Sequence, residues 1–257
     1  MSLTLVDSVA AQTLVDTILP ADTSGISIQN VQVTGDARCR GTFSGGSNVV
    51  TDPSALFPES GIVLSTGLVT DLVNQDGTEN YYAFDTPGDL EIYNGGNTGF
   101  DACTLSFEFQ CINTGTGTIS MDYTFASDEY IEQVDENLGY SDAFKILLNG
   151  QNLALTPQNE AITVYNINQS VNPDLFIFND PRPGAALYPL FEPDGFTKGL
   201  SATGTSQTGW NTLKIGIVDV GDYYLDSWLM LTGGSFSCPQ ETGSGSGGES
   251  ATIYLLW

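Results

Sequence analysis

The side chains that could carry out chemistry in this chain are almost all carboxylates. The 257 residues include 31 Asp and Glu, 6 Lys and Arg and no His, which gives a formal net charge of -25. The absence of histidine excludes Ser-His-Asp and Cys-His catalysis, imidazole-based zinc sites and a pH switch near neutrality. Many oxygen ligands without histidine favour hard cations, calcium above all. A solvated acidic surface is the structural alternative.

The carboxylates that could bind a cation lie next to predicted strands. They are Asp128 and Glu129 after ISMDYTF, Asp142 before AFKILLNG, Asp194 in PDGFT, and Asp219, Asp222 and Asp226 in DVGDYYLDS. In β-sandwich proteins, strand-end loops supply such carboxylates to calcium at about 2.3 to 2.6 Å. The EF-hand pattern is absent. We therefore predict at least one calcium site formed by some of these residues at one end of the domain.

Some of these carboxylates also have a purely structural interpretation. Asp222 and Asp226 lie where turn residues are common. Glu132, Asp135 and Glu136, which follow FASDEYI, are predicted to form a solvated acidic loop and not a ligand set.

The elements that must position these carboxylates are predicted to be mostly β-strands. Residues 3 to 19 carry apolar side chains at spacings of three and four, which predicts one short amphipathic helix ended by Pro20. Short apolar alternations follow: ISIQNVQVTG, GIVLSTG, TLSFEFQC, GTISMDYTFAS, AFKILLNG, AITVYNIN, TLKIGIVDVGD and SWLMLTGG. This pattern is typical of an antiparallel β-sandwich, here of jelly-roll type with a short N-terminal helix and a C-terminal extension strand. Trp228 and Phe236 lie at apolar positions of the pattern and are predicted to be core residues.

The chain divides into one large domain and a tail of different composition. A single β-sandwich is expected over residues 1 to 238, with long segments at 69 to 99 and 169 to 193 of the kind that often carry function. Asn168-Gln169-Ser170 is its only glycosylation sequon. Residues 239 to 250 are predicted to be a flexible Gly/Ser linker. Residues 251 to 257, ATIYLLW, form a β-prone apolar strand that needs a sheet edge in its own domain or in a neighbouring copy.

The four cysteines have spacings that favour disulfides over metal binding, because no C-x-x-C pair is present. Cys103 and Cys111 flank a predicted strand, and eight extended residues span about 26 Å. A disulfide needs Cα atoms about 4.4 to 6.8 Å apart, so these two cannot bridge each other. Each requires Cys39 or Cys238, or has no disulfide partner.

Charge and hydropathy exclude several classes of partner. The basic residues are scattered, so no basic stripe exists to neutralise nucleic acid or an anionic membrane. No run of about 18 apolar residues predicts a transmembrane segment. Residues 1 to 20 lack the basic start of a signal peptide, so an extracellular location must rest on other features.

Taken in order, several segments resemble the choice-of-anchor L domain, a family of secreted and surface-displayed β-sandwich modules. The resemblance covers roughly residues 8 to 236 and lies in GIVLSTG (61–67), YTFASDEYIE (123–132), SDAFKILLNG (141–150), ITVYNIN (162–168), DGFT (194–197) and LKIGIVDVGDYYLDSWLMLTGGSF (213–236). Asp128 stands where the family usually has Glu, and Lys198 where an apolar residue is common. The resemblance implies a β-sandwich at the cell surface or outside the cell. It implies no reaction.

The favoured function is a non-enzymatic extracellular structural or adhesive module, stabilised by calcium and self-assembling into a filament or surface layer through exchange of the terminal strand. The main alternative is a carbohydrate-binding surface module that uses the aromatic residues Tyr81, Tyr82, Tyr130, Tyr223, Tyr224 and Trp210. Two tyrosine pairs on one exposed face beside the acids would favour that alternative. A glycoside hydrolase built on Asp128/Glu129 or Asp219/Asp222 is the third hypothesis.

Overall fold

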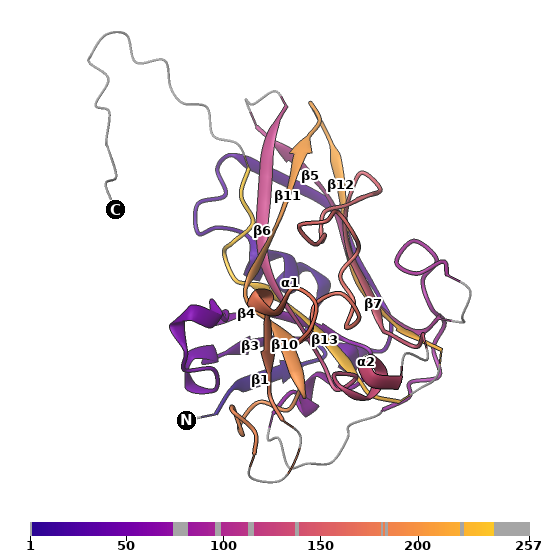
Figure 1. Ribbon diagram of the computed structural model, residues 1–257. Helices are drawn as coiled ribbons and strands as arrows, with labels where there is room; N and C mark the ends of the chain where they lie inside the picture. Colours follow the sequence, from indigo (N-terminus) through magenta and orange to yellow (C-terminus); the bar gives the residue numbers. More distant parts are fainter. Residues whose placement is uncertain are drawn as a thin grey trace.

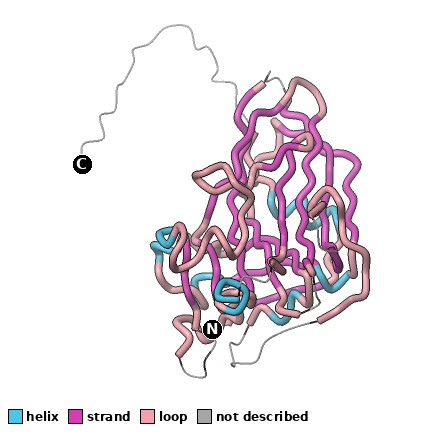
Figure 2. The backbone as a smooth tube through the Cα atoms, turned by 45° about the vertical axis from the view of Figure 1, so that its right-hand side comes forward, coloured by secondary structure: helices cyan, strands magenta, loops and turns pink. Residues whose placement is uncertain are grey.

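The structure is a computed structural model that describes residues 2–73, 82–95, 99–112, 116–136, 139–180, 182, 185–221 and 224–238. The described elements are β1 Thr4–Asp7, α1 Ala11–Ile18, β2 Ile26–Thr34, β3 Arg40–Ser44, β4 Ser60–Ser65, β5 Gly99–Cys111, β6 Gly117–Ser127, α2 Glu132–Glu136, β7 Ala143–Leu148, β8 Gln151–Asn152, β9 Phe176–Phe178, β10 Gly195–Thr197, β11 Leu200–Ser206, β12 Asn211–Val220 and β13 Ser227–Thr232. The long strands run side by side through the body of the molecule (Figures 1 and 2). The predicted all-β class is confirmed.

Two antiparallel sheets pack against each other as a sandwich. Sheet A has the order β1-β3-β4-β13-β6-β10-β9, with β11 also paired to β6, and sheet B has the order β2-β5-β12-β7-β8. The neighbours in each sheet are mostly distant in sequence. The fold is therefore built mostly from long-range pairings, and among the described strands β3–β4, β7–β8 and β9–β10 are the pairs of consecutive strands.

Sheet A is buried on both faces, which the alternating pattern did not predict. The core between the two sheets includes Phe107, Phe125 and Phe144. A second apolar cluster, which includes Trp228 and Phe196, covers the other face of sheet A. Both faces need apolar residues, so β4 and β13 are apolar runs without alternation.

The predicted helix over residues 3 to 19 is too long at its N-terminal end. Residues Thr4–Asp7 form strand β1, which pairs with β3, and the helix covers only Ala11–Ile18. Ser8 has φ 55°, and this left-handed residue turns the chain between the two elements. Pairing with β3 satisfies the backbone groups of residues 4–7, and this gain outweighs the helical spacing of their side chains. The helix buries Leu14, Val15 and Ile18, so its amphipathic character is confirmed.

Two further local predictions are wrong. Residues 161 to 168 form turns and not a strand, because Asn166 and Asn168 bond to nearby backbone groups. Residues Glu132–Glu136 form the short helix α2 and not a loop. Asp135 in that helix is exposed, as expected for a solvated acid.

Two disulfides connect the sheets and the C-terminal segment. Cys39 bonds Cys103, and Cys111 bonds Cys238. The exclusion of a Cys103–Cys111 bridge is confirmed, because both residues lie in the single strand β5. Trp228 and Phe236 are fully buried, as predicted. No helix in the described ranges is both long and apolar enough to cross a membrane.

Candidate functional site

Several strands begin or end at one end of the sandwich, and this brings distant acidic residues together. Ser127, the last residue of β6, pairs with Ser227 at the start of β13 and with Gly195 at the start of β10. Asp128, Asp226 and Asp194 are the adjoining residues in the sequence. In Figure 1 this end is the lower part of the view, near α2. The predicted convergence of strand-end loops is therefore present.

Four of the predicted carboxylates form a buried group, called here the acidic cluster. It consists of Asp128, Glu129, Asp142 and Asp226, whose exposed fractions are 1%, 1%, 1% and 2%. The backbone amide of Asp128 donates to the carbonyl of Asp226 at 3.1 Å. The amide of Asp142 donates to both carboxylate oxygens of Glu129 at 3.0 Å. Main-chain hydrogen bonds thus hold these four residues beside one another.

The Asp142 carboxylate joins three strands at the cluster. Its Oδ1 accepts from the Val220 amide at the end of β12, at 3.1 Å. Its Oδ2 accepts from the Thr66 hydroxyl at 3.2 Å, and the same hydroxyl accepts from the Ser227 amide at 2.9 Å. Asp142 immediately precedes β7. These bonds give its carboxylate a structural role as well as a charge.

The Asp226 carboxylate is differently placed, because one of its oxygens has no partner. Within the described part of the chain, Oδ1 accepts a long hydrogen bond from the Tyr82 amide at 3.4 Å, whereas Oδ2 is buried without any hydrogen bond. The carboxylate lies over the bare Cα of Gly67, where a Cβ would come within 1.8 Å of Oδ2. An ionised oxygen in this environment requires a proton or a cation.

Electrostatic repulsion adds to this requirement. Burial raises the pKa of Asp226 well above its usual value, and repulsion from Asp142 raises it further. The Tyr82 hydrogen bond lowers the pKa, and Asp71 and Asp101 add smaller increases. These neighbouring carboxylates make the position of Asp226 attractive for a positive charge.

The backbone near the cluster adopts conformations that side chains rarely favour. Leu225, directly before Asp226, has φ 68°, and Ile131, two residues after Glu129, has φ 79°. A left-handed conformation is costly for such residues, above all for a β-branched one. Strain of this kind is concentrated at functional sites, where the surrounding structure holds it in place.

Of the three remaining predicted ligands, two are buried and one lies outside the described residues. Asp194 and Asp219 are buried, with exposed fractions of 3% and 4%. Asp222 lies outside the described residues. Among the residues that the structure describes, no group of three or more acidic or cysteine side chains has a metal-binding arrangement. The described part of the cluster therefore contains carboxylates but not a complete set of side-chain ligands for a metal ion.

Sequence reasoning missed the polar residues that support the cluster. Thr66 and Gly67 come from the segment GIVLSTG, whose S-T-G ending is a signal for a tight turn at a strand end. Asp101 accepts hydrogen bonds from the amides of Phe84 and Thr86 at 2.8 and 2.7 Å. These bonds join the start of β5 to a loop that lies 15 to 17 residues earlier in the chain. No motif in the sequence predicts this contact.

The aromatic and glycosylation motifs give a mixed result. Tyr82 accepts a hydrogen bond from Arg38 and lies under its guanidinium, and Tyr224 is 59% exposed. Their sequence neighbours Tyr81 and Tyr223 lie outside the described residues, so the test by tyrosine pairs stays open. Asn168 of the sequon is buried, and its amide donates to Val164 and Tyr165 carbonyls. In this fold its side chain serves a turn.

Comparison with family profiles covers nearly the whole chain. The profile of the choice-of-anchor L domain matches residues 4–237. The chain belongs to the choice-of-anchor L family. Searches of curated proteins and of solved structures found no match. As a choice-of-anchor L domain the protein is a surface-associated module, and its ligand chemistry has to be argued from its own residues.

Proposed function

We propose that this choice-of-anchor L domain is a non-enzymatic extracellular structural module whose acidic end is stabilised by a bound calcium ion. Asp226 and Asp142 would supply carboxylate oxygens, and the Thr66 hydroxyl and nearby backbone carbonyls are further oxygen donors of the kind calcium accepts. Calcium takes oxygen ligands from separate loops with flexible geometry. A bound ion would neutralise the repulsion among these carboxylates and cross-link the strands that carry them.

The observation that carries this proposal is the buried Oδ2 of Asp226. It has no hydrogen bond within the described residues, and the neighbouring charges are carboxylates. Buried charges in proteins are paired or coordinate metals. No Lys or Arg bonds this carboxylate in the described structure. A cation from solution would neutralise the charge of the Asp226 carboxylate.

The burial of the cluster argues against the glycoside hydrolase hypothesis. Asp128 and Glu129 are each 1% exposed, so a polysaccharide does not reach their carboxylates in this conformation. A glycosidase needs its two carboxyl groups on either side of the scissile bond. The two disulfides support an extracellular setting, because such bonds persist in oxidising compartments.

The substitution Asp226→Asn tests the calcium site, because the change that it causes in melting temperature should have opposite signs in chelator and in calcium. In chelator, Asp226→Asn should raise the melting temperature, because it removes an uncompensated buried charge. In calcium the same variant should melt below the wild type, because it loses a ligand. Calcium at a hundredfold excess over Kd stabilises the folded wild type by about 2.7 kcal/mol.

Asp122→Asn is the matched control, because Asp122 is exposed on β6 and the variant loses the same single charge. Calcium is compared with sodium at equal ionic strength, so that general screening is subtracted. The calcium proposal is rejected if the wild type melts at the same temperature in calcium and in chelator, or if Asp226→Asn and Asp122→Asn respond equally.

Self-assembly through the terminal strand is the second part of the proposal. The support comes from the last described residues: Cys238 is fixed to β5 by its disulfide, and Ser237 pairs with Ser120 of β6, so residues 237 and 238 lie beside strand backbone. The sequence then continues with a Gly/Ser linker and ATIYLLW. Among the described strands, β1, β9, β2 and β8 end their sheets and are edges that an added strand can pair with.

A further inference from the structure

The outer face of sheet B contains two adjoining rows of strand residues without a carboxylate. Two neighbouring rows of residues cross β2, β5, β12 and β7. In register they are Gln32, Ser106, Lys214 and Leu147, followed by Thr34, Thr104, Gly216 and Lys145. Neither row contains a carboxylate, although the chain has 31 acidic residues, and both rows contain a lysine although Lys and Arg number 6.

A loop of residues 86 to 95 crosses this face and forms the wall of a groove. Ile92 is fully buried against the bare Cα of Gly216, where a Cβ would approach Ile92 Cγ1 to 2.9 Å. Lys214 Nζ bonds the Asp89 carboxylate at 2.7 Å and also bonds Glu91. These contacts fix the loop on the sheet, so the groove is formed before any ligand arrives.

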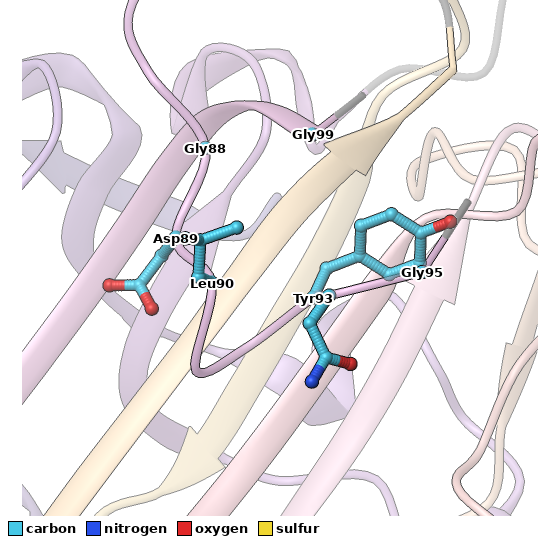
Figure 3. A pocket seen from close by; sticks show the side chains of 7 residues that line it. Gly88, Asp89, Leu90, Tyr93, Gly95 and Gly99 are labelled. Carbon is cyan, nitrogen blue, oxygen red and sulfur yellow. The ribbon is translucent and has the colours of Figure 1, made fainter. Parts of the chain in front are cut away.

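The groove consists of three adjoining hollows that share Asp89. The first, of about 300 Å³, lies between the loop and the polar rows. The second, of about 420 Å³, continues past Thr34, Asp36 and Thr86. The third, of about 290 Å³, includes Leu90 and Tyr93, and Figure 3 shows the side chains of Asp89 and Tyr93 on different sides of the loop. The result is a set of three adjoining hollows around the loop and not a single deep pocket.

The lining offers hydrogen-bonding groups that are mostly uncharged. The first hollow is lined by the hydroxyls of Thr34, Thr104, Ser106 and Thr212 and the amide of Gln32. The Thr34 and Thr104 hydroxyls bond each other at 2.7 Å, which leaves acceptor capacity on both. The Lys214 charge is compensated by Asp89 and Glu91. The partly buried Tyr93 ring lines the third hollow.

This combination selects one class of ligand. A net charge of -25 repels polyanions, and the two carboxylates that line the first hollow, Asp89 and Glu91, are both paired with Lys214. A neutral polysaccharide has hydroxyl donors and acceptors along its length and apolar ring faces that pack on aromatic side chains. We propose that the groove between the 86–95 loop and the polar face of sheet B binds a neutral polysaccharide. This site is separate from the acidic cluster and does not depend on the calcium proposal.

Affinity electrophoresis in native gels tests the site with soluble neutral polysaccharides: laminarin, galactomannan, dextran and hydroxyethylcellulose. At least one of them should retard the full chain, whereas the anionic polysaccharide alginate should not. Ser106→Tyr fills the first hollow from a half-buried strand position and should weaken retardation about tenfold. Thr203→Tyr is the matched control, because Thr203 is exposed on β11 in the other sheet.

Melting temperatures of both tyrosine variants verify that they fold, and gels run with calcium and with chelator separate this site from the acidic cluster. Retardation by none of the four polysaccharides overturns the proposal, as does equal retardation of Ser106→Tyr and wild type. A concentration-dependent dimer that Ser106→Tyr abolishes, without polysaccharide binding, would assign the face to a second copy and also overturn it.

Discussion

Two buried aspartates in this protein have opposite hydrogen-bonding situations. Asp101 is 1% exposed and accepts from the Phe84 amide, the Thr86 amide and the Thr86 hydroxyl. Asp226 is 2% exposed, and its carboxylate accepts from the Tyr82 amide alone among the described residues. On burial, the Asp101 carboxylate exchanges its hydrogen bonds with water for three from the protein, whereas the Asp226 carboxylate gains one long hydrogen bond from the described residues. The sequence gives both as Asp, so only their neighbours distinguish a structural anchor from a cation ligand.

The raised pKa of Asp226 predicts a pH dependence in the absence of calcium. The usual value is 3.8, and the folded-state pKa lies well above it because of burial and the facing carboxylates Asp142, Asp71 and Asp101. Between these two pKa values the folded state binds more protons than the unfolded state, so the contribution of Asp226 to stability rises as pH falls. At higher pH the ionised carboxylate destabilises the fold.

The measurement is the difference in melting temperature between Asp226→Asn and wild type, in chelator, from about pH 8 to about pH 4. The variant should be the more stable protein at the upper end, and its advantage should shrink with acidification. Taking the difference removes the effect of other acids, such as Asp36, whose hydrogen bonds to Arg38 lower its pKa. A difference that is constant over this range contradicts the prediction.

At the scale of elements, the segment of residues 234 to 238 is held by a disulfide, by hydrogen bonds to α1 and β6, and by the buried ring of Phe236. Cys238 bonds Cys111 at the end of β5, and Ser237 pairs with Ser120 of β6. Phe236 packs its ring against Phe107 and Phe109 in the core. The disulfide and the Ser237–Ser120 pair therefore connect this segment to strands of both sheets.

Removing this disulfide should cost more stability than removing the other one. The Cys111–Cys238 bridge closes a sequence separation of 127, against 64 for Cys39–Cys103. Loss of a native disulfide costs about 2 to 5 kcal/mol, and doubling the loop length adds about 0.6 kcal/mol. Urea unfolding of Cys111→Ser/Cys238→Ser and Cys39→Ser/Cys103→Ser, each against wild type, measures both costs. An equal or smaller loss for the first pair would count against the loop-length argument.

At the scale of the whole molecule, the described residues between 2 and 238 contain three apolar clusters and both disulfides. The fold of the described domain thus has its own stabilising interactions. The segment ATIYLLW lies outside the described residues, and we predict that it forms a strand on a sheet edge, because it is apolar and too short to fold alone. Addition of this strand to an adjacent copy would give a head-to-tail contact that does not close, and such contacts build filaments.

Deletion of residues 239 to 257 separates folding from assembly. The free energy of unfolding of the truncated chain should lie within about 0.5 kcal/mol of that of the full chain, because its apolar clusters and disulfides are intact. Light scattering at high protein concentration with calcium should show large particles only for the full chain. Equal polymers from both chains, or a monomeric full chain, would reject strand exchange.

The sequence by itself determined the features that depend on local pattern and composition. Alternating apolar segments specified an antiparallel sandwich, and the strand between Cys103 and Cys111 ruled out their bridge, because period and strand length are local quantities. The acidic residues at strand ends could be named for the same reason. Asp128, Glu129, Asp142 and Asp226 do lie together.

Only the tertiary structure decided which neighbours these residues have. Pairing with β3 makes residues 4 to 7 a strand where the sequence predicts a helix, and Asp226 Oδ2, which lies against Gly67, has no donor among the described residues. The second core on sheet A and the loop across sheet B likewise depend on contacts between segments far apart in sequence. Such contacts produce no periodic pattern in the sequence, because they depend on how whole elements pack against one another.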